Sequence, residues 1–186
     1  MSSSGFKTNH LAVVGLGLMG GGIAMAMRDR YGVPVQVVND LLTTADQRYH
    51  DMSLEAGLSD DLSVKRVQQL TAFSRYFSSL GQYNEAENRN LIAINVAQTS
   101  DLANREDMAK AYFEALYQLA TVRIQKNDLS GSLETFKRAL DFADSQVSNA
   151  EESQKGLDWL RYFSRAWNGQ AQSYLLLGQY DDALNA

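Results

Sequence analysis

A four-residue segment, Leu-Gly-Gln-Tyr, occurs twice in the chain, at residues 80–83 and 177–180. Each copy is followed by a polar residue, an acidic residue and an alanine. A weaker third copy lies between them at residues 126–132, where Asn127 takes the place of the glycine. Self-similarity at a spacing of a few tens of residues is typical of stacked repeat units, each of which buries its apolar face against its neighbours.

Each copy predicts a helix that ends at its glycine or asparagine, a tight turn, and a second helix that packs back on the first. Gly81, Asn127 and Gly178 stand where the chain leaves the helix with a positive φ, which glycine adopts freely and asparagine moderately. Small residues on either side of each turn allow the helices to approach closely: Ser74 and Ala86, Ala120 and Ser132, Ala171 and Ala183. Apolar residues at helical spacings of three and four are expected in the core: Val67, Leu70, Phe73 and Phe77, then Leu116, Leu119 and Val122.

This pattern resembles the tetratricopeptide repeat family, whose unit is 34 residues long. With each turn residue at position 15 of the unit, the large core residue at position 4 falls on Leu70, Leu116 and Trp167. The sequence departs from the family at Arg123 and Asn90, which replace aromatic residues, in having no proline to close a unit, and in turns 46 and 51 residues apart. The resemblance covers residues 62–186, with the third unit incomplete, and implies stacked antiparallel helix pairs.

The resemblance also implies a concave groove lined by the first helix of each unit, in which a protein or peptide binds. Its inner positions include Glu114 and the expected binding residues Arg75, Tyr117, Thr121, Arg165, Asn168 and Gln172. The two arginines are expected to bind a carboxylate of the partner, the two amides its backbone, and the tyrosine an apolar part of it. The alternative is that these residues form an ordinary solvated surface. An uncovered repeat end also predicts self-association.

A second informative stretch, residues 11–40, is expected to form a strand, a glycine turn, a helix and a second strand over Val33 to Asp40. Gly15, Gly17 and Gly20 satisfy the spacing G-x-G-x-x-G after an apolar run. The stretch resembles the start of 3-hydroxyacyl-CoA and 3-hydroxyisobutyrate dehydrogenases. That resemblance implies NAD held by the three glycines, with Asp40 on the ribose. No further strand-helix-strand pattern and no catalytic histidine motif of the family follows.

Two other interpretations of the same stretch stay open. Residues 11–27 carry no charge, and Ala24-Met25-Ala26 resembles a cleavage site, so the segment is also a candidate export signal. It is short and rich in glycine for a membrane span. The remaining N-terminal parts are expected to be a disordered tail over residues 1–10 and a helical linker over residues 41–61.

Composition narrows the range of functions. The net charge of −5 argues against nucleic acid as a partner and provides no basic patch for an anionic membrane. The chain has no cysteine and only two histidines, so neither a disulfide nor a structural zinc site is expected, and no metal site is assigned. The sequence therefore predicts a mainly α, cytoplasmic, peptide-binding scaffold without catalysis of its own. The alternative is a fragment of an NAD-dependent hydroxyacyl or hydroxyacid dehydrogenase.

Overall fold

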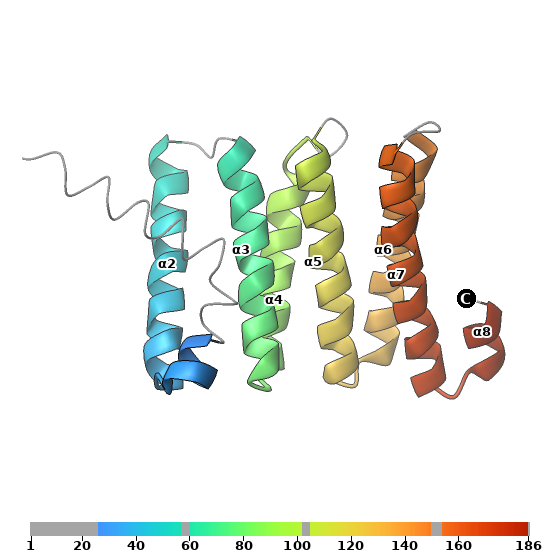
Figure 1. Ribbon diagram of the computed structural model, residues 1–186, viewed down its shortest axis with the longest axis horizontal. Helices are drawn as coiled ribbons and strands as arrows, with labels where there is room; N and C mark the ends of the chain where they lie inside the picture. Colours follow the sequence, from blue (N-terminus) through green and yellow to red (C-terminus); the bar gives the residue numbers. More distant parts are fainter. Residues whose placement is uncertain (1–25, 57–59, 102–104, 150–153, 186) are drawn as a thin grey trace, which may run out of the picture. The chain divides into compact units, whose positions relative to one another are not determined.

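The computed structural model describes residues 26–56, 60–101, 105–149 and 154–185. After a short helical segment at residues 26–31, the helices are α2 (Val35–Ala56), α3 (Asp60–Ser79), α4 (Tyr83–Gln98), α5 (Glu106–Gln125), α6 (Leu129–Asn149), α7 (Gln154–Leu176) and α8 (Tyr180–Asn185) (Figure 1). These described ranges contain no strand, which confirms the prediction of a mainly α protein. The chain divides into two compact units, Met1–Ala111 and Tyr112–Ala186, each described by itself below.

The three predicted turn residues all have the backbone conformation expected of them. The φ angles are 74° at Gly81, 63° at Asn127 and 74° at Gly178. The hydrogen bonds are also the same: at the first turn Gln82 N donates to Phe77 O at 3.0 Å and Gly81 N to Ser78 O at 3.0 Å. Equivalent pairs of bonds follow Asn127 and Gly178. The three turns therefore share one helix-ending motif, in which the left-handed residue lets the chain reverse while the last carbonyl groups stay bonded.

In the first unit, α3 and α4 pack side by side, as Figure 1 shows. Ala86, Ala93 and Ala97 of α4 are fully buried, so the two helices approach closely. Asn90, also fully buried, donates through Nδ2 to Ser74 Oγ at 2.6 Å. A hydrogen bond between the helices thus occupies the position where the resemblance leads one to expect an aromatic side chain.

In the second unit, α6 packs on α7, and α8 packs on α7. Ser132 and Ser173 are both buried and lie 3.1 Å apart through their hydroxyl oxygens. Arg123 replaces the other expected aromatic residue, and its Nη1 donates to Gly131 O at 3.1 Å and to Thr135 Oγ1 at 2.8 Å. Both departures from the family pattern are therefore polar contacts that join consecutive helices.

The apolar stripes predicted for the core are buried. Val67, Leu70, Phe73 and Phe77 in the first unit are at most 5% exposed, and Leu116, Leu119 and Val122 in the second are fully buried. Trp167 is an exception, because it was expected in the core and is 42% exposed. Its indole ring lies on the same side of α7 as the exposed side chains of Leu157 and Leu160.

The predicted strand over Val33 to Asp40 is wrong, because α2 begins at Val35. Pro34 precedes the helix and its carbonyl oxygen accepts the first helical hydrogen bond, from Val38 N at 3.2 Å. Val38, Leu42 and Ala45 are buried at spacings of four and three, which is the helical period rather than the alternation of a strand. Of the predicted helical linker over residues 41–61, residues 41–56 belong to α2 and residues 60–61 to α3, whereas residues 57–59 lie outside the described residues. The first strand and glycine turn, and the tail over residues 1–10, lie outside the described residues.

Candidate peptide-binding face

The predicted binding residues of the second unit lie on two helices that contact each other. Glu114, Tyr117 and Thr121 follow one another at spacings of three and four on α5, so they share a face of that helix. Arg165, Asn168 and Gln172 have the same spacings on α7, and all three are exposed. We refer to these six residues as the inner face.

The ion pair between Arg165 and Glu114 joins the two helices. Arg165 Nη1 donates to Glu114 Oε1 at 2.5 Å, and Nη2 donates to Oε2 at 3.3 Å. This two-point geometry fixes the orientation of the guanidinium as well as its position. The hydrogen bonds to Glu114 are the main reason that the pKa of Arg165 lies above its ordinary value.

Two aromatic rings also contact the guanidinium of Arg165. It lies 4.5 Å from the centre of the Tyr117 ring and 5.8 Å from that of Tyr162. Tyr117 itself packs edge-on against Phe136 of α6 at 5.6 Å. Tyr162 packs against Phe113 at 4.9 Å and Trp159 at 5.1 Å, and both of these side chains are fully buried. The centre of the inner face therefore rests on the aromatic core of the unit.

This geometry corrects the role predicted for Arg165. It was expected to bind a carboxylate of a partner, but Glu114 already supplies one. The hydroxyl of Thr121 donates to Tyr117 O at 2.9 Å, so it has an acceptor function left for a ligand. Asn168 and Gln172 present amide groups to solvent. Because Arg165 is paired with Glu114, the inner face suits a ligand with neutral hydrogen-bonding groups better than a strongly acidic one.

The pairing of Glu114 with Arg165 was not predicted, although the sequence carries a signal for it. Both residues stand at position 2 of consecutive repeat units, and their charges are opposite. Tyr162 also was not singled out; it precedes Arg165 by three residues and so lies on a neighbouring part of α7. Arg75, the remaining predicted binding residue, is exposed on α3 of the first unit.

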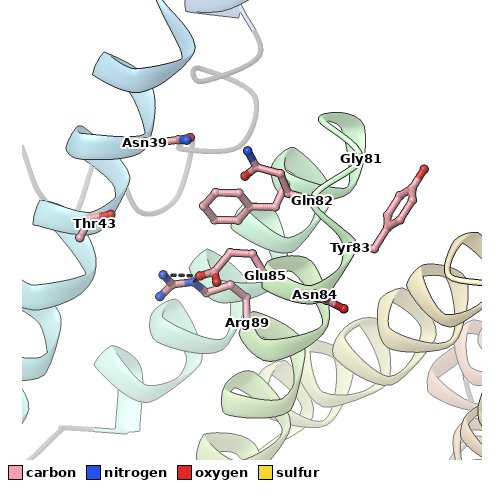
Figure 2. A pocket seen from close by; sticks show the side chains of 9 residues that line it. Asn39, Thr43, Gly81, Gln82, Tyr83, Asn84, Glu85 and Arg89 are labelled. Carbon is pink, nitrogen blue, oxygen red and sulfur yellow. Dashed lines mark hydrogen bonds and ion pairs between the residues drawn. The ribbon is translucent and has the colours of Figure 1, made fainter.

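A separate hollow of about 490 Å³ lies in the first unit, between α2 and the turn from α3 to α4. Figure 2 shows Asn39 and Thr43 pointing from α2 toward Gln82 and Glu85. Arg89 borders the hollow and donates through Nε to Glu85 Oε1 at 2.9 Å. The lining combines the aromatic rings of Phe77 and Tyr83 with polar side chains, and its two charged side chains, Glu85 and Arg89, bond to each other. It offers hydrogen-bonding groups but no nucleophile held by a base.

Of the residues predicted to hold NAD, Asp40 alone lies in the described part of the chain. Gly15, Gly17 and Gly20 lie outside the described residues. Asp40 lies in α2, and its Oδ1 accepts a hydrogen bond from Gln36 Nε2 at 3.0 Å. Asp40 therefore stands on a helix rather than at the end of a strand, where the dinucleotide fold places its acid.

Within the described ranges, no group of three or more histidine, aspartate or glutamate side chains could hold a metal ion. None of the helices there combines the length and apolar character needed to cross a membrane.

A second exposed surface on α7 is apolar. It contains Leu157, Leu160, Trp167 and Leu175, which are between 42% and 56% exposed. Their spacing places them on one side of the helix, and Phe163 packs against Trp167 with ring centres 5.4 Å apart. We call these five residues the α7 stripe. Most of it lies on a different side of α7 from Arg165, whereas Leu175 borders the inner face, because it follows Gln172 by three residues.

Comparison with known proteins adds no relative: no family model, curated protein or solved structure matches this chain.

Proposed function

We propose that the chain is a tetratricopeptide-like scaffold that binds a peptide segment on the inner face of its second unit. The observation that carries the proposal is the placement of Arg165, which is bonded to Glu114 of α5 and stacked on Tyr117. This contact joins the inner positions of α5 and α7 into one surface. The recurrence of one turn geometry at Gly81, Asn127 and Gly178 supports the repeat architecture on which the proposal depends.

The inner face has the chemistry that an extended peptide requires. The amides of Asn168 and Gln172 each offer two donors and an acceptor, which complement the N–H and C=O groups of a peptide backbone. Tyr117 and the aliphatic part of Arg165 supply apolar contact beside them. Because the guanidinium is already fixed by Glu114, little conformational entropy is lost there when a ligand binds.

The charge balance of the face defines the class of ligand. Arg165 and Glu114 neutralise each other, so a neutral or weakly charged peptide keeps the pair intact. A peptide with a carboxylate at this point would have to compete with Glu114 for the guanidinium. We therefore expect peptides that bind to the intact chain to carry polar uncharged or apolar residues opposite Arg165.

Selection of peptides from a random displayed library on the full chain tests the proposal. The affinity of a selected, fluorescently labelled peptide would then be measured by anisotropy. The double variant Asn168→Ala, Gln172→Ala should weaken binding by about tenfold or more. Arg138→Ala, an exposed change on α6, serves as the matched control and should leave the affinity unchanged. Equal affinities for all three chains would exclude the inner face as the binding surface.

The scaffold is also proposed to self-associate through the α7 stripe. Apolar side chains with this degree of exposure, grouped on one side of a helix, favour contact with another protein surface. The two activities can be tested separately, because Trp167 of the stripe lies on a different side of α7 from Arg165 and Gln172.

A further inference from the structure

A single carboxylate on α2 holds this helix against α3 and α4 through ion pairs. Asp46 of α2 forms ion pairs with both Arg66 of α3 and Arg89 of α4. All three side chains are largely buried, with exposed fractions of 19%, 11% and 13%. Arg89 is further fixed by Glu85, at 2.8 Å from Nη2 to Oε1, and lies 5.8 Å from the centre of the Phe77 ring. Arg66 and Arg89 thus form a positively charged binding site for one acidic side chain.

The buried apolar side chains of α2 are few. Among its described side chains, the buried apolar ones are Val38, Leu42 and Ala45, and Asp46 follows directly after them. These residues form a short motif: two aliphatic residues four apart, a small residue three further on, and then the acid. Such spacing is that of an amphipathic helix lying in a groove.

The side of α3 that carries Arg66 also carries polar groups that are buried without hydrogen-bond partners. Gln69, Phe73 and Tyr76 follow Arg66 at helical spacings, and each is at most 1% exposed. Neither amide atom of Gln69 nor the hydroxyl of Tyr76 has a hydrogen-bond partner in the described part of the chain. Burial also raises the pKa of the Tyr76 hydroxyl.

On α2, the Oδ1 atom of Asn39 is also buried without a hydrogen-bond partner. A buried polar group that lacks a partner is destabilising, because it has given up its hydrogen bonds to water, so this packing is far from optimal.

We infer that the face of α3 and α4 that carries Arg66 and Arg89 is a helix-docking site, which α2 occupies reversibly and for which a partner's amphipathic helix competes. The partner is recognised by a carboxylate at the position of Asp46, preceded by apolar residues at the positions of Val38 and Leu42. The unpartnered polar groups of Gln69 and Tyr76 on α3 provide hydrogen-bonding sites that α2 leaves unused. This site is independent of the inner face, which belongs to the second unit.

Hydrogen–deuterium exchange of the full chain, followed by mass spectrometry, tests the reversible docking. Amides of α2 should exchange faster than those of α3, and Asp46→Asn should speed their exchange by roughly tenfold or more, because both arginines lose a charged partner. Asp40→Asn is the matched control, since this acid lies on the same helix and its carboxylate accepts a hydrogen bond from Gln36 of that helix. Exchange of α2 at the rate of α3, or equal effects of the two substitutions, would overturn the inference.

A labelled peptide with the sequence of residues 35–56 tests the docking site itself. Added to the full Asp46→Asn chain, the peptide should bind measurably tighter than to the wild-type chain, in which α2 occupies the site at a high effective concentration. A peptide that itself carries Asp46→Asn should bind much more weakly to both chains. Failure of the unaltered peptide to bind the chain whose α2 has been loosened, or equal binding of the two peptides, would overturn the inference.

Discussion

Arg165 on α7 and Glu114 on α5 are joined by two hydrogen bonds from the guanidinium to the carboxylate. The pair changes what the inner face can bind. A single exposed arginine would attract acidic ligands, whereas this one is neutralised and stacked on Tyr117. Its main effect is to fix the surface on which Asn168 and Gln172 are displayed.

Removing the acid should convert Arg165 into a binding group for carboxylates. We expect Glu114→Gln to raise the affinity of a peptide with an aspartate opposite Arg165 by about fivefold to tenfold, because a charge-assisted bond becomes available. Fluorescence anisotropy with matched aspartate and asparagine peptides measures the effect. Glu134→Gln, an exposed change on α6, is the control. The prediction fails if both substitutions shift the two peptides equally.

Gly169 should tolerate no side chain. A Cβ atom at this position would overlap the ring of Phe136, which is buried between α6 and α7. Gly169→Ala is therefore expected to lower the free energy of unfolding by about 1–3 kcal/mol, as overpacking of a core does. Urea unfolding measures it, with Ser164→Ala on the exposed side of α7 as a control that should stay within about 0.5 kcal/mol. A wild-type midpoint for Gly169→Ala would show that the two helices are not packed as described.

The start of α5 should contribute to acid sensitivity. Hydrogen bonds from Arg105 are the main reason that the pKa of Asp107 lies below its ordinary value of 3.8. A lowered pKa in the folded state means that this carboxylate stabilises the protein above that value, and that the contribution is lost as the pH falls through the lowered pKa. Carboxyl NMR titration should place the Asp107 pKa below that of Asp107 in an Arg105→Gln chain. Coincident titration curves would contradict the contact.

The α7 stripe should drive association. We expect the wild-type chain to show a mass that rises with concentration in light scattering after gel filtration, because Trp167 and its neighbours are exposed apolar surface. Trp167→Glu should restore the monomer, since a charge in the stripe is costly to bury. Ser145→Glu adds the same charge on the exposed surface of α6 and should leave association unchanged. A wild-type monomer at high concentration would rule out this role of the stripe.

The parts of the fold that could be predicted are those with strong local causes. Gly81, Asn127 and Gly178 were recognisable because few residues accept a positive φ, and the buried stripes because their spacing is helical. The strand at Val33 to Asp40 was mispredicted because Val35, Val37 and Val38 favour a strand locally, while burial of Val38, Leu42 and Ala45 favours a helix.

The inner face was only partly predictable. Arg165, Tyr117 and the two amides could be assigned from repeat positions alone. The ion pair with Glu114 depends on how far apart α5 and α7 lie, and a one-dimensional pattern does not contain that distance. The exposure of Trp167 likewise depends on how other helices pack around α7, which the turn motif does not determine.

The central claim is that a peptide binds along the inner face of α5 and α7. The most direct test is to add a library-selected peptide to the labelled full chain and to follow nitrogen–proton NMR signals of side chains. We predict that the largest shifts occur at the side-chain amides of Asn168 and Gln172 and at the Arg165 guanidinium. Shifts confined to the α7 stripe or to α2, with those three signals unmoved, would contradict the claim.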